Sequence, residues 1–210
     1  MENTKNPILS ELPPENELVT ISLEPTTEQI VRLCTLMQKG CYLKIECGKS
    51  MRDVLCRQCG ISPEYVRVDI KVMFLESSPV DNIDEAIIKD GATIALSAAM
   101  PGLVGAAMRK DGLTWMRTSI TYHEGEAEHN ESLGLIQMKL FNQVMADLGE
   151  SFLKRGVYIK AGFLYESLKR FAPDFWLDFI KIAKNDEATT GQDLLEYLKE
   201  RNEWVKLLIH

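Results

Sequence analysis

The chain has 210 residues, a net charge of −7, 45% hydrophobic residues and 26% charged residues. This length is sufficient to bury a core in one domain or in two small ones. The acidic balance argues against a broad surface for nucleic acid or anionic membrane, because both attract clustered Lys and Arg. The N-terminal residues show no basic start followed by an apolar run, and no stretch has the length and apolarity of a spanning helix. We therefore predict a cytoplasmic protein with no nucleic-acid partner and no membrane partner.

The N-terminal third alternates between irregular, extended and helical patterns. Residues 1–17 contain three prolines among polar and acidic residues, which favours an irregular arm. Residues 18–25 are rich in β-branched side chains and predict a strand. Thr26 or Thr27 can then cap a helix that ends at a glycine. Residues 41–47 alternate between apolar and polar side chains, which predicts a strand with one exposed face.

Further short elements follow. Ser50 is a favourable N-cap for a short helix, and Gly60 can end that helix in the left-handed conformation. An Asp-Gly pair marks a tight turn before another extended stretch. The remaining predicted strands cover 66–75 and 93–96, with a hairpin over 108–122.

The pattern changes after a polar, acidic stretch at 123–131, which we interpret as a linker. From 132 to 210 the apolar residues recur at helical spacing, beginning with a helix over 133–148. Pro173 and Thr190 mark the starts of two later helices. The sequence thus predicts an N-terminal arm, a mixed domain over 18–122, a linker and a helical region over 132–210.

Two segments carry a resemblance to a known family. They are LKIECGKSMRDVLCRQCGIS and VMFLESSPVDNIDEAIIKDGATIALSAAMPGLVG, which together span about 41–105. The first resembles the strand, Gly-x-Ser, short helix and Gly-Ile of ubiquitin-like β-grasp proteins of the sulfur-carrier type, from thiamine and molybdopterin biosynthesis. The second resembles their later strands and Pro/Gly tail. The resemblance implies a β-grasp-like mixed sheet, which we assign to 18–122. Together with the helical spacing after 132, this predicts an α+β fold with a C-terminal helical region.

The chain departs from that family at the functional end. The carriers act through a free C-terminal Gly-Gly, whereas the corresponding tail here is internal and holds no Gly-Gly pair. Sulfur-carrier chemistry is therefore not expected. What the resemblance leaves is a scaffold that binds partners, so we predict a non-enzymatic interaction module with a protein partner and no cofactor. The small-residue loop is the candidate contact, through Met100, Pro101, Gly102, Leu103 and Gly105.

A second hypothesis places a metal at four of the five cysteines, Cys41, Cys47, Cys56 and Cys59. Thiolates suit zinc and iron–sulfur clusters. The spacing is not that of a known zinc knuckle, and alternation with leucine and isoleucine is typical of cysteine as a small core residue. An odd number of cysteines without a secretion signal favours reduced thiols. Zinc or an iron–sulfur cluster is thus the alternative to core packing, and a redox role is a further alternative.

A third hypothesis is a small-molecule binder or enzyme, with a pocket between the 97–107 loop and the C-terminal helices. The aromatic residues between 163 and 179 are interpreted as part of the hydrophobic core, and the alternatives are that they line an apolar pocket or form a dimer interface. They are Phe163, Tyr165, Phe171, Phe175, Trp176 and Phe179. The linker side chains could also chelate a divalent metal, through His123, Glu124, Glu126, Glu128 and His129. A homo-oligomer remains open.

Overall fold

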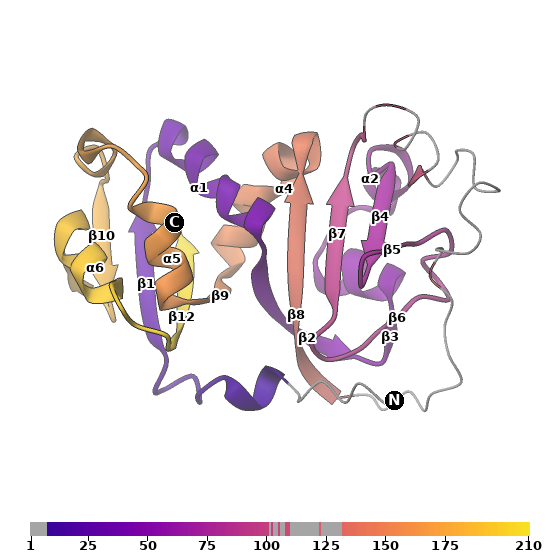
Figure 1. Cartoon of the computed structure of the whole chain (residues 1–210), viewed down its shortest axis with the longest axis horizontal. Helices are drawn as coiled ribbons and strands as arrows, with labels where there is room; N and C mark the ends of the chain where they lie inside the picture. The colour runs from indigo at the N-terminus through magenta and orange to yellow at the C-terminus, as the bar shows by residue number, and fades with distance from the viewer. Residues whose placement is uncertain (1–7, 101, 103–104, 106–107, 110–121, 123–131) are drawn as a thin grey trace. The chain divides into compact units, whose positions relative to one another are not determined.

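A computed structural model of the chain describes residues 8–100, 102, 105, 108–109, 122 and 132–210 (Figure 1). The chain divides into two compact units, each with its own strands and its own buried core. The first unit consists of Met1–Glu11 and Leu43–Asp147, and the second of Leu12–Tyr42 and Leu148–His210. Strand β2 (Cys41–Cys47) and helix α4 (Asn142–Arg155) contribute residues to both units.

The first unit holds the strand order β2-β8-β7-β4-β5, with β3 and β6 forming a separate two-stranded sheet. Strands β7 and β8 are parallel, and β4 is antiparallel to both β5 and β7. The elements are η1 (Ile8–Glu11), β3 (Lys49–Ser50), the π-helix η2 (Asp53–Gln58), α2 (Pro63–Val68), β4 (Val72–Leu75), β5 (Ser78–Pro79), β6 (Ile87–Ile88), β7 (Thr93–Ser97) and β8 (Ser132–Phe141).

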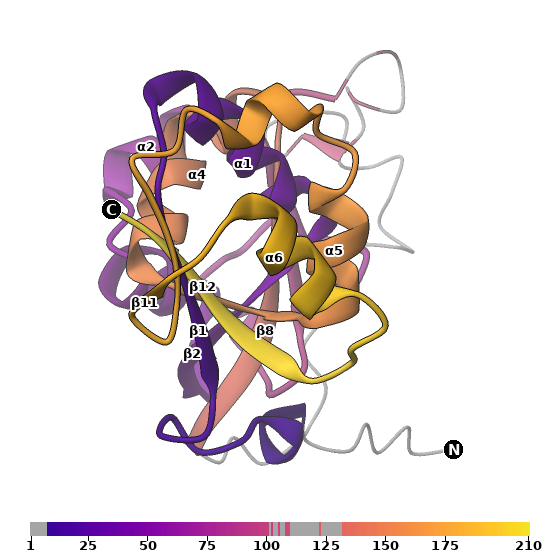
Figure 2. The ribbon, with the colours of Figure 1, turned by 90° about the vertical axis from the view of Figure 1, so that its left-hand side faces the viewer.

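The second unit holds the strand order β11-β10-β1-β12-β9, in which the central pair β1 and β12 is parallel. Helices α5 and α6 lie side by side in this unit (Figures 1 and 2). The elements are β1 (Val19–Glu24), α1 (Thr27–Lys39), β9 (Val157–Lys160), α5 (Ala161–Leu168), η4 (Pro173–Trp176), β10 (Lys181–Lys184), β11 (Glu187–Ala188), α6 (Gly191–Leu198) and β12 (Trp204–Ile209).

Local signals in the N-terminal third are confirmed. The strand over 18–25 is β1, and the helix capped at Thr26 is α1, where the Gln29 side chain accepts a hydrogen bond from the Thr26 backbone N–H at 2.7 Å. Strand β2 has the predicted bounds and alternating burial. Gly60 has a φ of +72°, the left-handed conformation expected after the short helix.

The fold class predicted from the resemblance is wrong. A β-grasp has a small sheet contained in one short domain. Here the sheet contains ten strands in the order β11-β10-β1-β12-β9-β2-β8-β7-β4-β5. Strand β8 lies between β2 and β7, and β1 pairs with β10 and β12. Three of the strands within 18–122, β1, β2 and β7, therefore pair with strands from the C-terminal part. The protein is α+β with a large mixed sheet.

The C-terminal part is not a helical region, since 132–141 forms β8 and four more strands follow. Ile136 and Leu140 fit the core face of a helix, but they also fit a strand in which Ile136, Met138 and Leu140 point inward. All three are fully buried, while Gln137, Lys139 and Phe141 are partly exposed. Short apolar runs are ambiguous in this way, and the pairing with β7 decides the outcome.

One other element differs from the prediction. The expected strand over 66–75 begins as helix α2, and only Val72–Leu75 is extended. The Ser62 hydroxyl accepts a hydrogen bond from the Tyr65 backbone N–H, and Pro63 occupies the first helical turn. These are helix-start signals, and they override the β-branched composition that follows. The predicted hairpin over 108–122 and the linker over 123–131 fall mostly or wholly outside the described residues.

Helices α1 and α4 pack closely where Gly149 faces Cys34, within the second unit. A Cβ atom at Gly149 would lie 2.8 Å from the Cys34 Sγ atom and 2.9 Å from its Cβ atom. The glycine therefore permits the helices to approach each other. No helix in the described part of the chain is long and apolar enough to cross a membrane.

We predict that Gly149→Ala destabilises the protein by about 1–3 kcal/mol, the usual cost of overpacking a core. In an open helix the same change would stabilise by up to about 1 kcal/mol, so the sign of the effect reports the packing. Urea unfolding measures it. Adding Cys34→Ala should recover part of the loss, because the Sγ atom is the nearest obstacle. Stabilisation by Gly149→Ala alone would show that the helices do not pack here.

Candidate functional site

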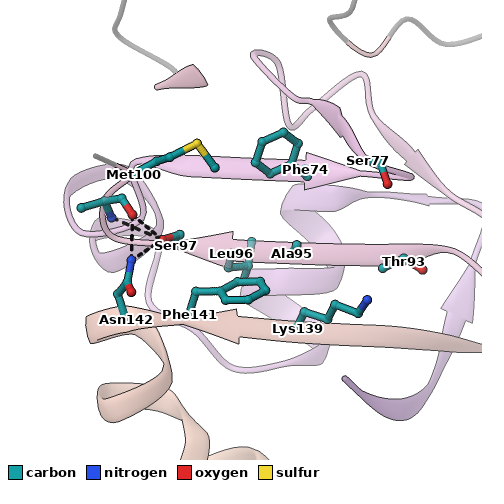
Figure 3. Close-up of a pocket in the computed structure, with 11 residues that line it drawn as sticks. Phe74, Ser77, Thr93, Ala95, Leu96, Ser97, Met100, Lys139, Phe141 and Asn142 are labelled. Atoms are coloured by element: carbon teal, nitrogen blue, oxygen red, sulfur yellow. Dashed lines mark hydrogen bonds between the residues drawn. The ribbon is translucent and has the colours of Figure 1, made fainter. Parts of the chain in front are cut away.

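A pocket of about 430 Å³ lies in the first unit, over one face of strands β4, β7 and β8 (Figure 3). We call it the β7–β8 pocket. It is defined by eleven described residues, Phe74, Ser77, Thr93, Ala95, Leu96, Ser97, Ala99, Met100, Lys139, Phe141 and Asn142. This volume lies within the range of sites that bind small molecules.

Strand register explains why these side chains meet. Phe74 pairs with Ala95, and Ala95 pairs with Lys139, so the three form one row across β4, β7 and β8. Ser97 and Phe141 form the next row. Side chains alternate between faces along a strand, so the intervening residues point into the core on the opposite side. Phe74 and Lys139 therefore lie on either side of the small Ala95, and Phe141 lies in the adjacent row, so aromatic and small side chains make up most of the pocket floor.

Asn142 closes one end of the β7–β8 pocket. Its Nδ2 atom donates hydrogen bonds to the Ala99 carbonyl oxygen at 2.7 Å and to the Ser97 Oγ atom at 3.1 Å. The Ser97 hydroxyl in turn donates to the same Ala99 carbonyl at 2.8 Å. Asn142 has a φ of +53°, a left-handed conformation that asparagine tolerates better than most residues. The junction between β8 and α4 is thus tied to the start of the loop that follows β7.

The opposite end carries the other polar groups, Ser77, Thr93 and Lys139 (Figure 3). Lys139 is the one charged residue among the described lining residues, and it has no ion-pair partner in the described part of the chain. Its ammonium can therefore pair with an anionic group on a ligand. The described lining holds no Asp, Glu, His or Cys.

The predicted binding loop begins at this pocket, since Met100 is one of the lining residues. Gly102 is exposed with a φ of +75°. Gly105 is buried, and a Cβ atom there would meet the Met100 backbone carbonyl, so the close approach is to the chain itself. Pro101 and Leu103 lie outside the described residues. The structure thus brings one of the five predicted loop residues to the pocket.

The cysteines show the environment of core side chains. Cys41 and Cys47 are buried on the inner face of β2, and burial raises the pKa of Cys41 to about 12 and that of Cys47 to about 11. Cys56 and Cys59 are partly exposed, and all five thiols are free. Among the described residues, no group of three or more His, Cys, Asp or Glu side chains could hold a metal ion. The candidate linker ligands, from His123 to His129, lie outside that part.

A serine–lysine pair in the second unit has the elements of a nucleophile and a base. The Lys39 Nζ atom lies 3.1 Å from the Ser167 Oγ atom, and desolvation together with Arg170 lowers the pKa of Lys39. However, the Ser167 hydroxyl donates to the Phe163 carbonyl one helical turn earlier, and Ser167 is only 6% exposed. A nucleophile must give its proton to the base and reach a substrate. Ser167 is therefore a buried helix serine whose hydroxyl is already hydrogen-bonded, and we do not assign this pair a catalytic role.

Sequence reasoning missed the main residues of the β7–β8 pocket. Phe74 falls in a predicted strand without a role, and Lys139, Phe141 and Asn142 fall in the predicted helix over 133–148. The alternation of Gln137, Lys139 and Phe141 with buried residues was a signal for a strand with one open face. The asparagine at a strand–helix junction was a second signal. Comparison of the chain with protein-family models, with curated proteins and with solved structures gives no match.

We predict that Asn142→Gly and Asn142→Ala separate the two roles of this asparagine. Both variants lose the hydrogen bonds to Ser97 and Ala99, at a cost of about 1–2 kcal/mol. Alanine must also adopt a positive φ, so it should cost roughly 1 kcal/mol more than glycine. Chemical denaturation compares the two variants. Equal stability of the two variants would contradict the strained geometry at Asn142.

We predict that two of the five thiols, Cys56 and Cys59, react with a disulfide reagent in the native protein at pH 8, because the others are buried. Burial keeps Cys34, Cys41 and Cys47 protonated, and the thiolate is the reactive form. All five should react after unfolding, and a chelator should leave both numbers unchanged. Metal bound at about one ion per chain, with Cys56 and Cys59 protected until chelation, would restore the metal hypothesis.

Proposed function

We propose that the protein is a small-molecule-binding protein whose ligand occupies the β7–β8 pocket. The observation that carries this proposal is the combination of an apolar floor with a few polar groups at its ends. Phe74, Ala95 and Phe141 provide the apolar surface, and Lys139 provides a positive charge with no ion-pair partner among the described residues. This composition is typical of ligand sites, in which apolar contacts provide affinity and a small number of polar groups orient the ligand.

The ligand class follows from the lining groups. An apolar body matches the two aromatic rings and Met100, and a carboxylate or similar anion matches the ammonium of Lys139. We therefore propose a small amphipathic carboxylate with an aliphatic or aromatic body. The lining suggests reversible binding rather than turnover, because the described lining residues provide apolar contacts and one ammonium group rather than a paired acid and base.

The pocket supports this proposal better than the other hypotheses. The interaction-module hypothesis depended on a β-grasp scaffold, and that support is lost with the fold. The metal hypothesis lacks a cluster of ligands among the described residues. The third hypothesis was a binder or enzyme with a pocket between the 97–107 loop and the C-terminal helices. The β7–β8 pocket agrees with it in part, because Met100 of that loop and Asn142 at the start of α4 line the pocket. We also propose a cytoplasmic location, which the five free thiols support.

We predict that decanoate binds to the wild-type protein and that Ala95→Trp reduces this binding at least tenfold, because the indole fills the space between Phe74 and Phe141. Isothermal titration calorimetry measures the affinity. Ala95→Ser, which leaves the pocket open, is the matched control. Since Ala95 is partly exposed on the sheet, the tryptophan variant should fold, and circular dichroism verifies this. Unchanged affinity in a folded Ala95→Trp protein would disprove the site.

The charge is tested separately with Lys139→Gln. This change should weaken decanoate binding about fivefold to tenfold, equivalent to about 1–1.4 kcal/mol, and should leave decanol binding unchanged. Lys44→Gln, on the exposed face of β2, is the control for net charge. Equal losses for decanoate and decanol would show that Lys139 does not pair with the carboxylate.

A further inference from the structure

A second cavity, of about 930 Å³, lies in the second unit and is open to solvent. We call it the aromatic groove. Its walls come from the segment between α5 and β10, from β10 itself, and from the turn that leads into α6. The lining side chains are mainly aromatic and aliphatic, and they include Phe171, Trp176, Leu177, Phe179, Ile180 and Leu195. No residue of this groove belongs to the β7–β8 pocket.

Buried contacts hold the aromatic wall in place. Phe175 is 4% exposed, and its ring lies 4.2 Å from that of Phe171 and 5.3 Å from those of Trp176 and Phe179, measured between ring centroids. The buried Gln29 side chain donates a hydrogen bond to the Phe175 carbonyl oxygen at 2.6 Å. The wall is therefore ordered before a ligand arrives, which lowers the entropy cost of binding.

Gly191 allows Trp176 to occupy its position. A Cβ atom at Gly191 would lie only 2.5–2.7 Å from three carbon atoms of the indole ring, so the ring packs directly on the backbone at the start of α6. On the same wall Trp176 stacks with Phe179, with centroids 5.7 Å apart and an interplanar angle of 24°. These two near-parallel rings form an aromatic stack along the wall, and a planar aromatic ligand can extend it by offset or edge-to-face contact.

Large apolar side chains at the groove remain exposed. Leu177 is 80% exposed and Ile180 is 76% exposed, the two highest values among the exposed large hydrophobic residues. Exposed apolar surface grouped beside a cavity, rather than scattered, commonly marks a binding site. A ligand in the aromatic groove would cover part of both side chains.

The charges that line the groove are positive. Lys169 and Lys181 are lining residues, and none of the fifteen described lining residues is Asp or Glu. Lys169 is already paired with Glu166 at 2.5 Å, whereas Lys181 has no ion-pair partner in the described part of the chain. Asp174 and Asp178 occur in the same segment but do not line the cavity. The groove thus complements a negative charge placed near Lys181.

We propose that the aromatic groove is a second ligand site, specific for a planar aromatic carboxylate. The aromatic body packs beside the stacked Trp176–Phe179 pair and covers Leu177 and Ile180. The carboxylate pairs with Lys181. This site is independent of the β7–β8 pocket, because the two cavities lie in different units and share no residue.

The test uses two probes that differ only in charge, naphthalene-2-carboxylate and naphthalene-2-carboxamide. Both are titrated by calorimetry into the full-length Ala95→Trp protein, in which the β7–β8 pocket is blocked. The carboxylate should bind at least fivefold more tightly than the amide. Equal affinity of the two probes, or no saturable binding of the carboxylate, would overturn the proposal. Failure here leaves decanoate binding in the wild-type protein unaffected, so the two proposals are tested separately.

Variants then locate the site. Lys181→Gln should reduce carboxylate affinity to that of the amide and leave amide binding unchanged, and Lys154→Gln on α4 is the matched control for net charge. Phe179→Ala should weaken both probes. Lys181 is exposed, so its variant is expected to fold even if Phe179→Ala does not. A Lys181→Gln protein that keeps the preference for the carboxylate would overturn the assignment of the anion site.

Discussion

The parallel pairing of β7 with β8 is the interaction on which the candidate site depends. On its inner face Ile94 and Leu96 pack with Met138 and Leu140, and all four side chains are fully buried. On its outer face the same register brings Lys139 beside Ala95, and Phe141 beside Ser97. A one-residue shift of β8 would exchange the two faces and place a charged side chain in the core. Burial of the inner face therefore determines the composition of the pocket.

The pairing also determines how the loop after β7 is held. Parallel strands end at the same edge of a sheet, so Asn142 at the end of β8 lies next to Ser97 at the end of β7. A single amide can then bond the serine hydroxyl and the Ala99 carbonyl. The positive φ at Asn142 allows the chain to leave the strand and begin α4 in this position. Local strain at one residue is thus compensated by two hydrogen bonds.

The two cavities have a similar composition in different settings. Each combines an aromatic surface with a lysine that lacks an ion-pair partner in the described part of the chain. The β7–β8 pocket is built on strands, and its rows follow from register. The aromatic groove is built on an irregular segment, which depends on the buried Phe175 and on Gln29 for its order. Charged and polar groups placed at the edge of such surfaces orient a ligand more than they strengthen its binding.

The sequence by itself determined the local elements with strong short-range signals: β1, the capped helix α1, the alternating strand β2, and the glycine at 60. Their causes lie within a few residues, in caps, alternation and turn conformations. It did not determine the ten-stranded order, the strand character of 132–141, or the meeting of Phe74, Lys139 and Asn142. Those features depend on pairing between segments tens of residues apart, and an apolar run such as that of β8 satisfies either a helix or a strand until its partner is present. Tertiary structure alone decided them, because a strand is stabilised by its neighbours and not by its own sequence.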